Sequence, residues 1–331
     1  MIQLRLAAGD LERMRFDVSP MVEVVQSGRM LSSGRGRAPY QEWFAEARDR
    51  VRALDTQLLA LLLPEGPFIA DFLVSRPAHV AGIDEHLRAI AEYPADRLRD
   101  DLLVVWPDRR PPRLVELLGD PAAARRIADV LHDYWTLLIE PHWRRIKGVL
   151  RDDVAYRATR LAADGVDGML GDLHKELSVA DGTLLIDKPH HDLDRTLNGA
   201  GLCLVPSVFS WPQLIVMAQP GQPADITYGC RAAATVWDGA APLDDPLGAL
   251  LGRTRAAILR SLEQPGSTTE LAVALDHSMP AISQHLAVLR RGGMVTSWRS
   301  GRHVLYQRSI LATSVVAAND DVSEAAPFRP A

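Results

Sequence analysis

The residues whose types and spacing could do chemistry lie close together, between positions 278 and 302. Ser283, Gln284 and His285 follow one another, and a Gln side chain can pair bidentately with adenine while Ser and His offer single hydrogen bonds. Guanidinium groups beside a Ser-Gly turn could sit on phosphates or in a minor groove. These side chains indicate contacts to double-stranded DNA. The expected contact set is Ser278, Met279, Ala281, Ser283, Gln284, His285, Arg290, Arg299 and Arg302.

Helical elements must position these side chains. One apolar face runs along residues 247–262, and Pro265-Gly266 ends that helix. The sequence Ser267-Thr-Thr-Glu270 is a capping box, which predicts a short helix over 268–275. Asp276-His277 predicts a tight turn, and Ser278 can cap a third helix over 279–291. A helix, a tight turn and a second helix form the geometry that places the second helix in the major groove.

The third helix and the hairpin after it complete the motif. Ile282, Leu286 and Leu289 predict the core stripe of the helix, so Met279, Ala281, Gln284 and Val288 are expected on the opposite face, flanked by Ser283 and His285. Strands are predicted over 294–298 and 302–307, around a turn at Ser300-Gly301. Helices and hairpin together predict a winged helix-turn-helix over residues 244–310.

Charge is distributed unevenly along the chain. The 331 residues carry a formal net charge of -5, yet residues 252–308 hold eight Arg and no Lys against three acidic residues. Residues 1–251 hold 28 basic and 36 acidic residues. A basic module on an acidic body suggests that one end meets a polyanion, although chance clustering explains the charge alone equally well.

The motifs of this module resemble the ArsR family of winged-helix regulators. Residues 278–295 read SMPAISQHLAVLRRGGMV, close to the family pattern S-x-P-x-x-S-x-H-L-x-x-L-R-x-x-G-x-V, and residues 299–306 match its R-x-G-R-x-V-x-Y wing. The resemblance covers about a fifth of the chain and implies a homodimer on a DNA operator. Many members sense metals through an E-L-C-V-C-D-L motif, but Ala272 and Ala274 stand at the two thiolate positions here. We therefore expect no metal at that site and no cofactor.

The remaining chain is expected to be mainly α with a small β-rich unit, an α+β fold. Residues 1–177 carry helical patterns over 40–63, 82–93, 112–118, 121–139 and 142–174, with Pro141 kinking or restarting a helix and a loop over 27–39. Short β-rich runs follow over 178–240: Thr183–Asp187, Leu202–Val205, Gln213–Met217, Asp225–Tyr228 and Ala233–Trp237. Both parts are expected to pack as one sensor or dimerisation body, before a linker at 238–242. Residues 311–331 are expected to form a flexible tail.

The N-terminal body shows no enzyme signature. The segments Phe16–Glu23 and Gly201–Phe209 resemble those of longer regulators whose helical N-terminal region precedes an ArsR-type domain. A polar run, Asp187–Asp192 with Asp194, could bind a cation or do acid–base work, but a surface loop explains it better. Core packing is likewise favoured over a small-molecule pocket for the ligand candidates Trp135, His142, Trp143, Phe209 and Trp211.

Three functions remain open on the sequence alone. The first is a regulator, expected to be a repressor, that responds to a partner or to a small organic effector. The second is a constitutive or architectural DNA binder, and the third is an enzyme with a DNA-binding appendage. Two cysteines give no disulfide framework, and no apolar run approaches the length of a membrane span, so we expect a cytoplasmic protein.

Overall fold

The structure is a computed structural model, and it describes residues 1–34, 40–66, 68–74, 82–189, 191–237, 245–300 and 303–320. The chain divides into two compact units, Met1–Asp238 and Gly239–Ala331. The sequence predicted a body ending at 240 and a DNA-binding unit beginning at 244. The α+β class expected from the sequence is confirmed.

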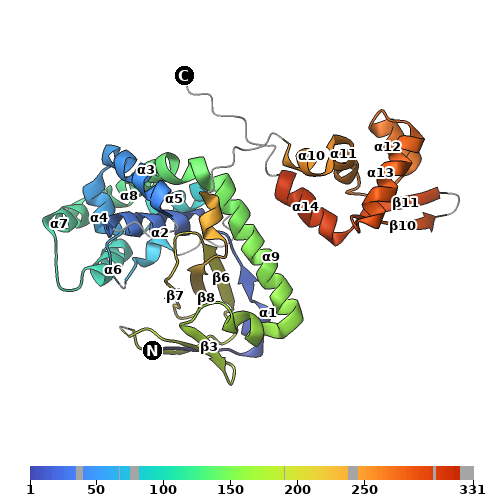
Figure 1. The fold of residues 1–331 in the computed structure, drawn as a ribbon. Helices are drawn as coiled ribbons and strands as arrows, with labels where there is room; N and C mark the ends of the chain where they lie inside the picture. The colour runs from blue at the N-terminus through green and yellow to red at the C-terminus, as the bar shows by residue number, and fades with distance from the viewer. Residues whose placement is uncertain are drawn as a thin grey trace. The chain divides into compact units, whose positions relative to one another are not determined.

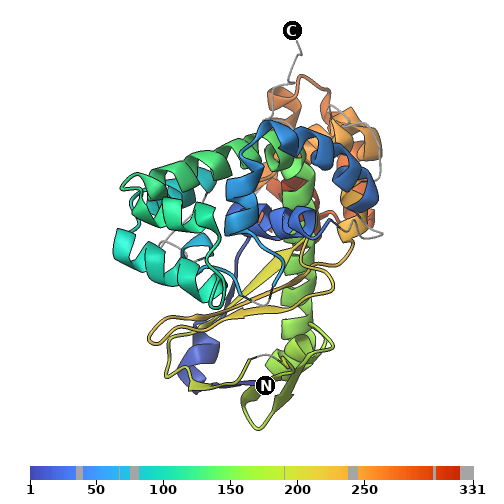
Figure 2. The same ribbon diagram turned by 90° about the vertical axis from the view of Figure 1, so that its left-hand side faces the viewer.

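Helices fill one end of the N-terminal unit (Figures 1 and 2). The helix α2 (Pro20–Ser32) begins at Ser19, whose hydroxyl accepts a hydrogen bond from the Val22 amide, and most of its residues are buried. A helix buried on nearly every side must lie inside a packed cluster. The other helices at this end are α3 (Gln41–Arg50), α4 (Thr56–Leu62), α5 (Ile83–Ala91), α6 (Ala95–Val105), α7 (Pro112–Gly119) and α8 (Ala123–Tyr134). The short helix α1 (Ala8–Glu12) lies apart from them, beside the sheets (Figures 1 and 2).

The described residues of this unit also form two four-stranded sheets. The first has the order β3-β4-β1-β5, with β1 antiparallel to β4 and parallel to β5. The second has the order β2-β6-β8-β7, with β6 parallel to both of its neighbours. Strands from the N-terminus therefore lie in both sheets. The bounds are β1 (Ile2–Arg5), β2 (Arg15–Phe16), β3 (Leu177–Ala180), β4 (Thr183–Ile186), β5 (Leu193–Thr196), β6 (Leu202–Ser207), β7 (Ile215–Met217) and β8 (Ala224–Gly229).

The long helix α9 (Glu140–Gly171) runs from the helical end of the unit alongside the sheets (Figures 1 and 2). A π-helical turn, η4 (Trp135–Ile139), precedes it and ends two residues before Pro141. Proline lacks the amide hydrogen and its ring collides with the carbonyl of the preceding turn, so a break in the helical hydrogen bonding is expected here. The predicted interruption at Pro141 is confirmed.

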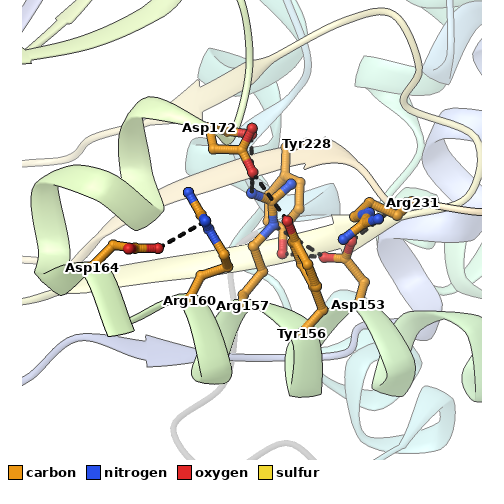
Figure 3. A network of polar contacts seen from close by, with 8 residues as sticks. All are labelled: Asp153, Tyr156, Arg157, Arg160, Asp164, Asp172, Tyr228 and Arg231. Carbon is orange, nitrogen blue, oxygen red and sulfur yellow. Dashed lines mark hydrogen bonds and ion pairs between the residues drawn. The ribbon is translucent and has the colours of Figure 1, made fainter. Parts of the chain in front are cut away.

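A buried polar network fixes α9 to β8 (Figure 3). Asp153 accepts hydrogen bonds from the Tyr228 hydroxyl at 2.7 Å and the Arg231 amide at 2.9 Å. Arg157, one turn later, lies 3.8 Å from the same carboxylate and donates to the Asp172 carbonyl at 3.0 Å. Asp153 and Arg157 are both almost fully buried. Burial of the two charges is tolerated because each compensates the other and has further hydrogen-bond partners.

The C-terminal unit is a winged helix-turn-helix with one hydrophobic core (Figure 1). Its described sheet is three-stranded, in the order β10-β11-β9. Side chains from the helices and the first strand of the wing share the core, among them Leu259, Leu271, Leu286 and Val295. The elements are α10 (Pro246–Leu251), α11 (Arg253–Ser261), β9 (Gly266–Ser267), α12 (Thr268–Ala274), α13 (Met279–Arg291), β10 (Val295–Ser300), β11 (His303–Arg308) and α14 (Ile310–Asp320).

Part of the loop expected over 27–39 is helical. Ser27 and Gly28 lie inside α2, where the Ser27 hydroxyl donates to the Val24 carbonyl at 3.1 Å and lies 3.0 Å from the Tyr134 hydroxyl. A Cβ at Gly28 would collide with the side chain of Leu63. These small residues therefore mark close helix packing and not a turn. Residues 35–39 lie outside the described part.

Further elements differ from the expectations. The single helix expected along 247–262 is divided into α10 and α11 at Gly252, whose φ is 88°. The run Ala233–Trp237, expected as a strand, contains the 3-10 helix η5 (Ala233–Val236). The single helix expected over 40–63 is divided, because Asp55 caps a new helix by accepting from the Leu58 amide at 3.0 Å. A flexible tail was expected from 311, whereas α14 continues to Asp320 and buries Ala312 and Val316 in the core of the unit.

Candidate nucleic-acid interface

Local features fix the start of α12, the turn after it and the start of α13. In the capping box, the Ser267 hydroxyl accepts from the Glu270 amide at 3.3 Å, and the Glu270 carboxylate accepts from the Ser267 amide at 2.7 Å. Asp276 has a φ of 52°, which the short side chain of Asp tolerates better than most. The Ser278 hydroxyl then accepts from the Ala281 amide at 3.4 Å and begins α13. The predicted helix, tight turn and helix are thus present.

The helix α13 has one buried side and one exposed side. Ile282, Leu286 and Leu289 are buried in the core, as their spacing predicted. Ser283 and Gln284 are exposed, and His285 is half-buried at the border. The exposed side therefore carries hydrogen-bonding groups of the kinds that read base edges.

The remaining expected contacts occupy different parts of the helix. Ser278 is exposed at the cap, Ala281 is half-buried in the first turn, and Arg290 is exposed in the last turn. Met279 is 54% exposed, and its sulfur accepts a hydrogen bond from the Thr269 hydroxyl of α12 at 3.6 Å. Met279 thus lies beside α12 and not on the side opposite the core stripe.

Two exposed residues were missed as candidate contacts. Ala287 and Arg291 lie three and seven positions after Gln284, so helical geometry puts them on the same side of α13. Arg291 was not among the contacts expected from the sequence. The signal that could have found it is this seven-residue spacing.

The first strand of the wing packs into the same core as α13. Val295 is buried, and the ladder pairs Arg299 with Val304 and Ser300 with His303. Arg299 is exposed near the end of the hairpin. Arg302 lies outside the described residues, so its predicted contact stays a prediction. The hairpin therefore presents at least one arginine, Arg299, at the protein surface.

The ligand candidates of the N-terminal unit lie among other aromatic rings. Trp135 packs edge-on against Trp143 at 5.2 Å, and His142 packs edge-on against Trp237 at 5.4 Å. Burial lowers the pKa of His142. Phe209 is buried in ring contacts that include the same Trp237. Trp211 is 49% exposed. Their role as a small-molecule site stays a prediction.

The polar run around residues 187–194 ties the N-terminus to the first sheet. Lys188 pairs with Glu176 at 2.5 Å, and Asp194 pairs with Arg5 at 2.5 Å. The N-terminal amine donates to the His191 carbonyl at 2.5 Å. Within the described ranges, no three His, Cys, Asp or Glu side chains group as metal ligands do, and every helix is too short or too polar to cross a membrane.

Two family models match this chain. Residues 108–234 match a family of unknown function, DUF5937, which covers α8, α9 and most strands of the second sheet. Residues 250–297 match the model described as a helix-turn-helix domain, which spans α11 to the first strand of the wing. The second match coincides with the elements that present Gln284 and its neighbours.

The HTH-type transcriptional repressor SmtB of two Mycobacterium tuberculosis strains is 45% identical to this chain over 62 residues. The C-terminal unit carries a helix-turn-helix domain of the ArsR/SmtB type. The aligned part is 18% of this chain and 46% of the repressor, so the chain spans about half the length of the curated relatives it matches.

Solved structures match a similarly small share of the chain. A double mutant of Lactococcus lactis ZitR in its apo form is 28% identical, over 22% of this chain and 57% of its own, with a TM-score of 0.20. Reduced HlyU from Vibrio cholerae is 34% identical, over 22% of this chain and 77% of its own, also with a TM-score of 0.20. Assignment of the domain therefore rests on the sequence matches.

Proposed function

We propose that this protein is a transcriptional regulator that binds double-stranded DNA in a sequence-specific manner. The observation that carries the proposal is the division of α13 into a buried apolar stripe and an exposed side with Ser283 and Gln284. The similarity of this region to a transcriptional repressor supports it. In the proposed complex α13 enters the major groove, and Gln284, His285 and Ser283 contact base edges.

The arginines have a different role in this proposal. Arg290 and Arg291 near the end of α13, and Arg299 and Arg302 on the wing, would contact phosphates or the minor groove. Such contacts fix the position of the protein on the duplex and make its affinity depend on salt. No catalytic role is proposed for any residue.

We further propose a homodimer that acts as a repressor. Two copies of α13 would then read half-sites about one helical turn apart. The N-terminal unit would form the dimer interface. The dimer would exist in two states that differ in the distance between its two α13 helices, and a small effector would shift their balance by binding one state more tightly. A direct test is the symmetry and spacing of the half-sites in selected operator sequences.

The main experiment is a fluorescence-anisotropy titration of the full chain against its own upstream DNA and a scrambled duplex, at two salt concentrations. Tight, salt-dependent binding that prefers the upstream duplex supports a specific regulator. Equal affinity for both duplexes would favour an architectural DNA binder. No binding at low salt would refute a DNA function.

The Gln284→Ala variant separates specific from unspecific binding. It should lose preference for the upstream duplex while keeping its affinity for the scrambled duplex, because only the base contact is removed. Gln264→Ala is a matched control, since Gln264 is also exposed but lies after α11, outside the proposed interface. If both variants behave alike, α13 is not the reading helix.

A further inference from the structure

An arginine of the first sheet lies on the side that faces the core. Strand β5 is an edge strand, and its Arg195 is the register partner of Leu4 on the parallel strand β1. Register partners project from the same face of a sheet, and residues two apart on a strand share a face. Leu4 is fully buried, and Leu193 and Leu197 on either side of Arg195 both belong to the same hydrophobic cluster. Arg195 therefore occupies a position at which an apolar side chain is expected.

Arg195 as a whole is half-buried, and one atom of its guanidinium is unsatisfied. Its Nη1 atom is buried and has no hydrogen-bond partner among the residues that the structure describes. A buried charged donor without a partner opposes folding. On the other face of the same sheet, Arg5 pairs with Asp194 at 2.5 Å. The exposed arginine thus has a carboxylate, whereas Nη1 of the core-facing arginine has no partner.

Arg195 lines a cavity of about 410 Å³. Its described lining consists of Arg13, residues 195–200 and residues 219–222, and includes two arginines but no Asp or Glu. A volume of this size lies within the range of small-molecule sites, roughly 300–1,000 Å³. The cavity is therefore positively charged and large enough for a small organic molecule.

Tight turns form two walls of this cavity. In residues 197–200 the Ala200 amide donates to the Leu197 carbonyl at 3.1 Å, and the two central residues have φ values of 54° and 82°, as a type I′ Asn-Gly turn requires. In residues 219–222 the Gln222 amide donates to the Gln219 carbonyl at 3.2 Å, and a Pro-Gly pair lies between them. Arg13 donates to the Gly199 carbonyl at 2.5 Å. The cavity is thus held open by short, hydrogen-bonded segments.

We propose that this cavity binds a small organic anion, with its carboxylate or phosphate group held by Arg195. The planar guanidinium matches either group through paired hydrogen bonds, and a desolvated site strengthens such pairs. Arg13 provides a second positive charge at the same cavity, and the amide side chains of Asn198 and Gln222 provide neutral donors and acceptors for the rest of the molecule. This site goes beyond the proposed regulator function and does not depend on DNA binding.

Isothermal titration of the full chain with sodium succinate and with sodium phosphate tests the site. Sodium chloride at equal ionic strength is the reference. We expect saturable binding of at least one of the two anions, and the one that binds more tightly identifies the preferred group. Arg195→Gln should weaken that binding by about tenfold or more, whereas Arg5→Gln should leave it within about twofold. If neither anion binds more than chloride does, or if both variants bind as the wild type does, the proposal is refuted.

The stability of the free protein distinguishes a binding arginine from a structural one. Without an anion, Arg195→Leu should unfold at the same temperature as the wild type or higher, because leucine suits a core-facing strand position beside Leu193 and Leu197. Residues that bind a ligand are commonly retained even where they lower the stability of the free protein. A lower Tm for Arg195→Leu would show that Arg195 supports the fold and would overturn the proposal.

Discussion

Replacing Glu23 by glutamine should remove a pH dependence from the stability of the N-terminal unit. Glu23 is fully buried in the first turn of α2 and accepts hydrogen bonds from the Val208 amide at 3.0 Å and the Phe209 amide at 3.4 Å. Burial raises the pKa of Glu23 from 4.5 to about 8, and these two hydrogen bonds only partly oppose the rise. The folded protein therefore holds this carboxyl group protonated at pH values at which the unfolded chain ionises it.

The sign and size of the effect follow from proton linkage. Between pH 4.5 and about 8 the folded state binds one proton more than the unfolded state at Glu23, so the free energy of unfolding falls as the pH rises. The slope is about 1.4 kcal/mol per pH unit, and the whole window therefore contributes about 5 kcal/mol. This stabilisation is complete below pH 4.5 and is lost above about pH 8.

Urea denaturation followed by tryptophan fluorescence measures this contribution. Six of the seven tryptophans lie in the N-terminal unit, so the signal reports mainly on that unit. The free energy of unfolding should fall by several kcal/mol more in the wild type than in Glu23→Gln between about pH 5 and pH 8. The exposed Glu42 supplies the control variant, Glu42→Gln, which should follow the wild type. A constant difference between wild type and Glu23→Gln over this range would refute a protonated Glu23.

Three other variants test the interface and the core. Gln284→Ala should reduce discrimination between operator and scrambled DNA by ~1–3 kcal/mol in anisotropy titrations, and an unchanged preference would exclude a base contact. Arg299→Gln should weaken binding to every duplex and lower the salt dependence of the affinity by about one phosphate, while Arg52→Gln in the other unit should do neither. If Arg299→Gln keeps the salt dependence of the wild type, Arg299 does not belong to the interface. Asp153→Ala should destabilise the N-terminal unit by ~3–5 kcal/mol in urea denaturation, because it leaves the buried Arg157 with only the exposed Asp172 carboxylate, 3.5 Å away, and removes the acceptor of the buried Tyr228 hydroxyl. Asp152→Ala, at an exposed position, should cost far less, and similar losses would contradict the network's importance.

The C-terminal unit could be predicted from the sequence because its signals are local. The capping box at Ser267 and Glu270, the turn at Asp276 and the cap at Ser278 are each made by residues within three positions of one another. Such patterns specify helix ends without knowledge of the rest of the chain. The face of Met279 was readable in the same way, because Met279 lies three and seven positions before the buried Ile282 and Leu286 and so shares their side of the helix. Its contact with Thr269 agrees with that placement.

The N-terminal unit could be predicted only in part because its contacts span most of the chain. The segments Phe16–Glu23 and Gly201–Phe209 are brought together when β2 pairs with β6 and Glu23 accepts the amides of Val208 and Phe209. The first segment ends in an acidic residue and the second contains a run of apolar residues. Neither sequence shows what the segment packs against. The helix α2 was missed in part for the same reason, since Gly28 resembles a loop residue until Leu63 is packed against it.

Gln284 and Arg195 show why different evidence finds different sites. Gln284 lies on an exposed helix face, where a polar residue is ordinary, so only the motif around it indicates a function. Arg195 has no motif, and its alternation with Leu193 and Leu197 would suit any edge strand with one polar exposed face. Only the register with β1 shows that its side chain projects with Leu4 to the core side, where a charge is out of place. The proposed anion site thus rests on a buried donor atom without a partner beside a cavity, whereas the recognition helix is indicated by its sequence pattern.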